Sequence, residues 1–177
     1  MKTSRMILIS LLVTLTLSAW VTWPLAREFH QGMPASHRPE AGGARHMIPG
    51  DHLQFWFQLW MFADTVAGKT PLFCHPYEFN QGDDQARCRR GTYYFPLGAL
   101  YAVGHAIGGR AVGWNGMLLF CAWVSYLMTW LLVRRYGVSA VTAAVAALPA
   151  LLLPYFWSCC LGGSPTGPGM MWVPVIF

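Results

Sequence analysis

Charge is the scarcest property of this 177-residue sequence. Only 11% of the residues are charged and 55% are hydrophobic, whereas about a quarter of an ordinary soluble domain is charged. This composition excludes a typical soluble domain and indicates a membrane protein. All seven acidic residues lie in one central stretch, which we therefore expect to be in water: Glu28, Glu40, Asp51, Asp64, Glu78, Asp83 and Asp84.

Several motifs of common enzymes are also missing. The sequence has no zinc-ligand spacing, phosphate-binding glycine loop, nucleophile elbow or dinucleotide fingerprint. His52 and His105 are single histidines without metal-ligand spacing. Asp83 and Asp84 could offer oxygen ligands to a divalent metal, but two adjacent acids are more often a solvated turn. The cofactor therefore stays open, and no nucleic-acid partner is expected.

Three segments without charge are long enough to cross a bilayer, which takes about 20 apolar residues. They are residues 6–23, about 112–133 and 138–161. Pro149 and Pro154 would bend the third, although spanning helices tolerate proline better than soluble ones do. The sequence thus predicts an all-α integral membrane protein with three transmembrane helices. An alternative for the first segment is a cleaved signal peptide, although the small-residue cleavage points there are poor.

The basic residues beside these segments predict their orientation. Lys2 and Arg5 precede the first segment, and Arg134 and Arg135 fill the short turn between the second and third. Positive charge in short flanks marks the cytoplasmic side. Residues 24–111 would then form a large external loop. Its own arginines and lysine carry little weight, because loops longer than about 60 residues cross the membrane largely regardless of charge.

The cysteines fall into two groups. Cys121, Cys159 and Cys160 lie in or at the edge of predicted spans and are most simply small apolar fillers. Cys74 and Cys88 lie in the predicted external loop, where an oxidising compartment would let them form a disulfide. Closing a loop of that size is worth roughly 3 kcal/mol, but the sequence alone does not determine the pairing.

Inside the loop, glycine, proline and polar residues over 31–50 indicate irregular chain. Apolar residues then recur with helical period over about 51–67, and a second apolar segment over about 95–108 leads into the second span. Both are expected to be amphipathic helices at the membrane interface, and the first could instead lie against spanning helices. The first carries a thin polar stripe that would face a cavity: Asp51, Gln54, Gln58 and Thr65.

Asp51 stands directly before a run of Phe, Trp, Leu and Met, where an ionised carboxylate is costly unless it is paired or wet. It follows Pro49–Gly50 and has Gln54 three residues on, which is typical of a helix N-cap with a reciprocal glutamine. Capping does not exclude chemistry, because a capping carboxylate is held rigidly and still presents an oxygen to the cavity.

The order of these segments carries a resemblance. The chain has one span, then "PGDHLQFWFQLWMFADTVAGKTPLF" and "YYFPLGALYAVGHAIG", then "WNGMLLFCAWVSYLMTWLLVRRYG" and "LLPYFWSCCLGGSPTGPGMMWVPVIF". It resembles the N-terminal part of bacterial GT-C-fold integral-membrane glycosyltransferases, which have a large first external loop with membrane-surface helices and an early acid. Its anchors include Pro49–Gly50–Asp51, Pro71, Asn115 and Pro154–Tyr155.

The resemblance implies transfer of a sugar from a polyprenyl-phosphate carrier to an acceptor at the outer face of a bacterial inner membrane. Asp51 matches the loop acid regarded in that family as catalytic base, or as the group that binds a metal or the acceptor. A base must take a proton from the attacking hydroxyl, and burial among aromatic rings tends to raise the pKa of a carboxylate toward a useful range. Gln54 and Gln58 would then contact substrate.

The arginines of "RCRRG" are further candidates. Arg87, Arg89 and Arg90 could hold the donor phosphate. Contact with anionic lipid headgroups, or a solvated face, is the simpler interpretation of such a cluster.

The family has many more spanning helices than this chain. A new apolar segment begins at about 170–177 with no polar flank after it, so we expect a truncated GT-C fold that is inactive alone. The alternative is a small non-enzymatic membrane protein whose external loop binds a partner protein or lipid. Membrane lipids are expected contacts in either case.

Overall fold

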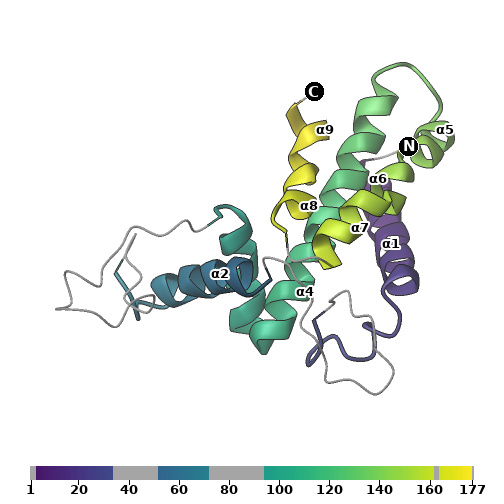
Figure 1. Cartoon of the computed structure of the whole chain (residues 1–177). Coiled ribbons are helices and arrows are strands. Elements are labelled where there is room, and N and C mark those ends of the chain that lie inside the picture. The colour runs from purple at the N-terminus through teal and green to yellow at the C-terminus, as the bar shows by residue number, and fades with distance from the viewer. Residues whose placement is uncertain (1–2, 34–51, 72–93, 162–163, 177) are drawn as a thin grey trace.

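The computed structural model describes residues 3–33, 52–71, 94–161 and 164–176. These residues form helices and no strand, as the sequence predicted (Figure 1). The elements are α1 (Thr3–Val21), α2 (His52–Val66), α4 (Leu97–Arg134), α5 (Ala140–Ala147), α6 (Pro149–Leu152), α7 (Pro154–Leu161), α8 (Thr166–Gly169), the 3₁₀ helix η1 (Met170–Trp172) and α9 (Val173–Ile176).

The central element is α4, which two glycines divide into two arms. Gly108 and Gly109 have non-helical backbone angles, and Gly109 has a φ of +84° that side chains with a Cβ rarely adopt. The first arm, residues 97–107, packs closely on the second arm, residues 110–134. A Cβ added to Gly104 would lie 2.9 Å from the Cα of Gly113. The arms overlap the segments predicted over about 95–108 and 112–133, which the structure joins in one kinked helix.

Helix α1 packs antiparallel to the second arm of α4. Near the middle of α1, the Trp123 Nε1 donates a hydrogen bond to the Ser10 Oγ at 2.9 Å. Beyond its C-terminal end, the Asn115 Nδ2 donates to the backbone oxygen of Phe29 at 2.8 Å. The N-terminus of α1 and the C-terminus of α4 therefore lie at the same end of the pair (Figure 1).

The buried face of α1 is polar and small, whereas its exposed face is apolar and large. Ser10, Thr14 and Ser18, spaced by one helical turn, are all buried. Leu8 and Leu12 are 57% and 54% exposed. Small and hydroxyl-bearing residues are typical of helix interfaces inside membranes, where the surrounding lipid is as apolar as leucine.

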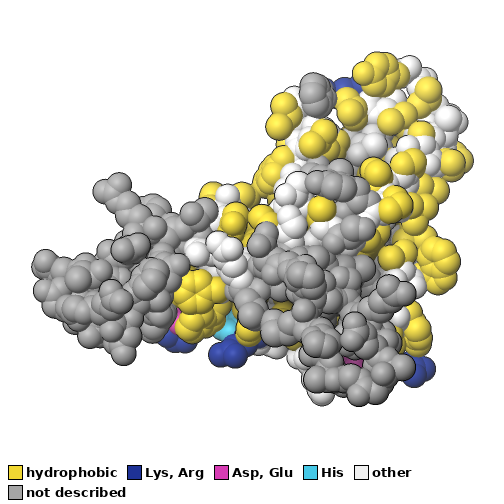
Figure 2. All heavy atoms as spheres, viewed as in Figure 1, with side chains coloured by type: hydrophobic (Ala, Val, Ile, Leu, Met, Phe, Trp, Pro, Cys, Tyr) yellow, Lys and Arg dark blue, Asp and Glu magenta, His cyan; other side chains and the backbone are white. Residues whose placement is uncertain are grey.

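Two helices are long and apolar enough to cross a membrane, with windows at Ser4–Val21 and within Leu97–Arg134. The 19 residues of α1 rise about 28 Å, close to the roughly 30 Å of a hydrocarbon core. Figure 2 shows hydrophobic side chains over the upright part of the molecule. Lys and Arg side chains lie near the upper and lower ends of that part.

The third predicted span is broken into three helices, α5, α6 and α7. The breaks fall at the two prolines that the sequence predicted to bend it, Pro149 and Pro154. Proline lacks the N–H of a helical hydrogen bond and disfavours helical angles in the residue before it. Leu153, before Pro154, accordingly has a ψ of 117°, whereas Leu148, before Pro149, keeps helical angles, so the sharper break is at Pro154. Only a shorter apolar stretch, Ala140–Leu152, remains there.

Candidate binding site beside the amphipathic helix

Helix α2 buries one face against α4. Phe55, Leu59 and Met61 are at most 1% exposed, and the Phe55 ring meets the Trp114 ring edge-on, with centroids 5.4 Å apart. A neighbouring face of α2 is half-buried and carries Trp56, Phe57 and Trp60. The sequence run of aromatic residues therefore divides into a packed core and a surface that is still accessible.

This accessible surface forms one wall of a cleft of about 340 Å³, lined by Trp56, Phe57, Trp60 and Arg110. Arg110 is exposed and comes directly after Gly109, at the start of the second arm of α4. Its Cζ lies 5.6 Å from the centroid of the Trp56 ring, within the range of a cation–π interaction. The break in α4 thus places a cation beside the aromatic residues of α2.

Two side chains from the first arm fix the orientation of Trp56. The Trp56 Nε1 donates a hydrogen bond to the Tyr101 hydroxyl at 3.0 Å. The Tyr101 ring is stacked on His105, with centroids 5.6 Å apart and an angle of 9° between the planes. Tyr101 is fully buried, so the indole that lines the cleft is held by a rigid partner.

This combination of groups suits an amphipathic anion. A guanidinium binds phosphate through two parallel hydrogen bonds, and the flat aromatic faces can contact the C–H face of a sugar or an apolar chain. The cleft lies at the end of the second arm that follows the kink, which is one end of a candidate span. A ligand with a phosphate and a lipid tail has both kinds of partner at that boundary.

Most of the site residues predicted from the sequence lie outside the described residues. The structure begins α2 at His52, directly after Asp51, so the predicted capping position adjoins a helix. The carboxylate of Asp51 itself is not described. The same holds for the other predicted residues of the loop: Arg87, Arg89, Arg90, Asp83, Asp84, Glu78, Cys74 and Cys88.

The described part of the polar stripe does not form one surface. Gln54 is exposed, whereas Gln58 is buried and its Oε1 has no partner among the described residues. The Thr65 Oγ1 is paired with the Met61 carbonyl oxygen at 3.0 Å and with the Thr70 hydroxyl at 2.9 Å. The three residues therefore differ in exposure and in hydrogen-bond partners.

Asp64 is the acid of α2 that the structure describes. Its side chain is 5% exposed, and its Oδ1 lies 3.0 Å from the Nζ of Lys69, whose side chain is 61% exposed. This ion pair gives Asp64 a structural role at the C-terminal end of α2. Among the described residues, no group of three His, Cys, Asp or Glu could hold a metal ion.

Arg110 is the site residue that the sequence did not single out, because it was counted only among the basic residues of the loop. One signal was available. A lone arginine directly after Gly–Gly and directly before a long apolar segment marks both a chain reversal and a membrane boundary.

No family model, curated protein or solved structure matches this chain.

Proposed function

We propose that this chain belongs to a membrane glycosyltransferase of the GT-C type, which transfers a sugar from a lipid-phosphate carrier to an acceptor at the outer membrane face. The observation that carries the proposal is the cleft in which the exposed Arg110 guanidinium stands over Trp56. A cation at the end of an apolar helix, beside flat rings, is complementary to a sugar phosphate on a lipid.

In this proposal, Arg110 holds the donor phosphate, and Trp56 and Trp60 contact the sugar or the first units of the lipid. Asp51 stands directly before α2 in the sequence, and α2 carries both tryptophans. The base and the donor site would thus share one helix. Gln54, exposed one turn from the start of α2, is available to a sugar hydroxyl, while Arg87, Arg89 and Arg90 remain candidates for the same phosphate.

The same proposal places the chain in a bacterial inner membrane with residues 24–111 outside. The antiparallel packing of α1 and α4 supports this orientation, because Arg5 and Arg134 come to the same end of the pair. Single cysteines at Ser36 and Ser139, treated with a membrane-impermeant thiol reagent in intact cells, test it. Labelling only of the cysteine at position 139 would show that the orientation is the opposite one, and the proposed site would then not be outside the cell.

The function is tested by the affinity of the purified chain for a polyprenyl phosphate. Arg110→Gln should weaken binding about tenfold or more, because a hydrogen bond to a charged group is worth roughly 1.5–3 kcal/mol. Arg27→Gln is the matched control, since Arg27 is also exposed and its Cζ lies 4.9 Å from the Trp23 ring centroid. An equal loss of affinity in both variants would mean that the phosphate responds to the overall positive charge and not to a specific contact with Arg110.

Sugar transfer must be measured separately, in membranes that contain the enzyme to which this chain belongs and a lipid-linked sugar donor. Transfer that depends on Arg110 supports an enzyme. Binding of polyprenyl phosphate without any transfer would instead favour the non-enzymatic alternative, a membrane protein that binds lipid.

A further inference from the structure

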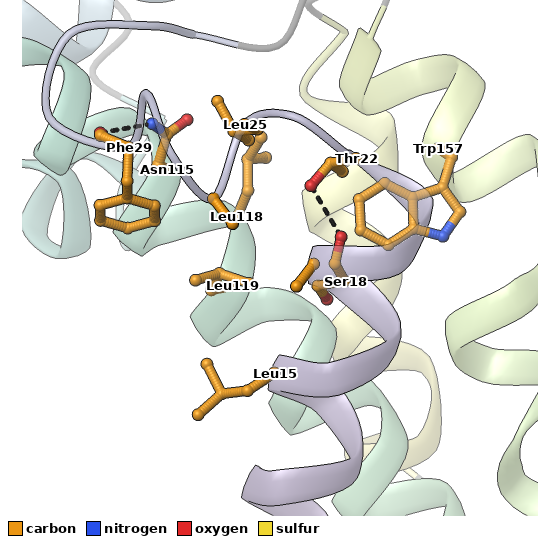
Figure 3. A pocket seen from close by; sticks show the side chains of 11 residues that line it. Leu15, Ser18, Thr22, Leu25, Phe29, Asn115, Leu118, Leu119 and Trp157 are labelled. Atoms are coloured by element: carbon orange, nitrogen blue, oxygen red, sulfur yellow. Dashed lines mark hydrogen bonds between the residues drawn. The ribbon is translucent and has the colours of Figure 1, made fainter.

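A second cavity, of about 360 Å³, lies between α1 and α4 (Figure 3). Its walls include Leu15 and Ser18 of α1, Phe29 from the chain that follows, and Leu118 of α4, and Trp157 of α7 closes one side. The volume is within the range of small-molecule sites, about 300–1,000 Å³. This cavity shares no lining residue with the Arg110 cleft.

Two buried polar atoms in the wall of the cavity have no partner among the described residues, the Ser18 Oγ and the Asn115 Oδ1, and the second lies in a side chain whose direction is fixed. Asn115 is 1% exposed, and its Nδ2 donates to the carbonyl oxygens of Phe29 at 2.8 Å and Gly32 at 2.7 Å. Carbonyl oxygens only accept hydrogen bonds, so both must face the amide nitrogen, and the direction of the amide group is fixed. The Asn115 Oδ1 has no partner among the described residues, and Figure 3 shows it on the side of Leu25, another lining residue.

The chemistry of the walls defines what could satisfy that oxygen. An unpaired buried carbonyl costs roughly 1–3 kcal/mol, which a ligand with an O–H or N–H group would recover. The lining residues include no charged side chain, so an anion or a cation would be desolvated there without a partner. The other lining groups are almost all apolar, apart from the hydroxyls of Ser18 and Thr22.

We propose that this cavity binds a neutral lipid of the surrounding bilayer, with an alkyl chain along Leu15, Leu118 and Leu119 and a hydroxyl group donating to the Asn115 Oδ1. The cavity lies between the two candidate spans, and α1 exposes large aliphatic residues on its other faces, so lipid is the solvent expected around it. The inference does not depend on the proposed glycosyltransferase activity.

Competition between matched probes tests the proposal on the unmodified chain. A photoreactive dodecanol should label peptides that contain Leu118 or Phe29. Unlabelled dodecanol should compete about 2- to 12-fold better than dodecyl methyl ether, because the ether lacks the donor of one neutral hydrogen bond. Dodecyl phosphate should compete worse than dodecanol. Equal competition by the alcohol and the ether, or preference for the phosphate, would overturn the proposal.

A variant that fills the cavity gives a second, independent measurement. Ala19 lines the cavity, and Ala19→Phe should abolish labelling by the photoreactive alcohol. Leu12→Phe is the matched control, because Leu12 lies on an exposed face of the same helix and does not line the cavity. Unchanged labelling in Ala19→Phe would place the alcohol elsewhere on the chain.

Discussion

The two helices that pack on α4 do so in opposite ways. Helix α1 buries Ser10 and Thr14 against the second arm and exposes leucines. Helix α2 buries large apolar residues such as Phe55 and Leu59, together with Gln58 and Asp64, and leaves Gln54 exposed. The first arrangement suits a helix in lipid, where polar groups need protein partners. The second suits a helix with one face in water.

The boundary between the two arrangements is the break in α4. The arm before Gly108–Gly109 packs with α2, and the arm after them packs with α1, although its first residues also meet α2 through Arg110 and Trp114. The comparison therefore teaches that two glycines and the following Arg110 separate the part of α4 that packs with α1, a candidate span, from the part that packs with Trp56 of α2.

The largest expected effect concerns the acid that precedes the surface helix. If Asp51 is the base, Asp51→Asn should slow sugar transfer by roughly 10²- to 10⁴-fold, the usual contribution of a positioned proton acceptor. The variant should insert and express normally, because asparagine caps a helix about as well as aspartate. The measurement is transfer in membranes from a lipid-linked sugar donor by the enzyme that contains this chain.

Asp51→Ala separates the two roles of this residue, since it should lose the cap, about 1 kcal/mol, as well as the base. Near-normal transfer by the asparagine variant would leave Asp51 as a cap only. The search for the base would then turn to Asp64 or to the loop acids Glu78, Asp83 and Asp84.

The second prediction tests whether the exposed face of α1 is in lipid. Leu12→Arg should disfavour membrane insertion by about 3 kcal/mol, since arginine at the centre of a spanning helix costs roughly that much. Val66→Arg is the matched change on α2, where Val66 is 66% exposed, and it should cost less than about 1 kcal/mol. An insertion assay that scores glycosylation of a reporter tag measures both. Equal, small effects would mean that α1 faces water, and the contrast between the helices would fail.

The third prediction tests the close approach of the two arms of α4. A Cβ on Gly113 would lie 2.9 Å from the Tyr101 carbonyl oxygen, whereas a Cβ on Gly116 would meet nothing within 4 Å. Gly113→Ala should lower the free energy of unfolding by about 1–3 kcal/mol, as overpacking does. Gly116→Ala should raise it by up to about 1 kcal/mol through helix propensity.

Loss of helical circular dichroism during titration of mixed micelles with a denaturing detergent compares the two variants. Destabilisation of the same size in both would show that the arms do not touch at Gly113. The expected difference is specific to position, because both glycines lie in the same arm and receive the same methyl group.

Composition and local periodicity were sufficient to predict the all-helical class and two apolar segments of spanning length. They also predicted a bend at Pro149 and Pro154, because proline acts through its own backbone, although the structure divides this segment there instead of keeping one bent span. The apolar segments on either side of Gly108–Gly109 were predicted from their apolar pattern, whereas the break at these glycines was not predicted. These features depend on residues near one another in the chain.

The contacts between distant segments were not predictable in this way. Asn115 donates to carbonyl oxygens 83 and 86 residues away, and Arg110 meets Trp56 only because the first arm of α4 turns back. The buried Ser10, Thr14 and Ser18 could have been noticed as hydroxyl residues on one face of an aliphatic helix. The helix that covers them could not have been predicted, because periodicity identifies a helix face without identifying the element that packs on it.

The smallest effect concerns the Asp64–Lys69 ion pair, which tests how accessible the C-terminal end of α2 is to water. A double-mutant cycle with Asp64→Asn and Lys69→Met should give a coupling energy of about 0.2–1 kcal/mol, the value of pairs with one member in water. Lys69 is 61% exposed, so salt should screen the coupling further. The two single changes should differ, because Lys69→Met leaves the buried carboxylate unpaired, whereas Asp64→Asn leaves a neutral amide beside a solvated lysine. A coupling above about 3 kcal/mol that salt does not reduce would mean that this end of α2 is as desolvated as the α1 interface.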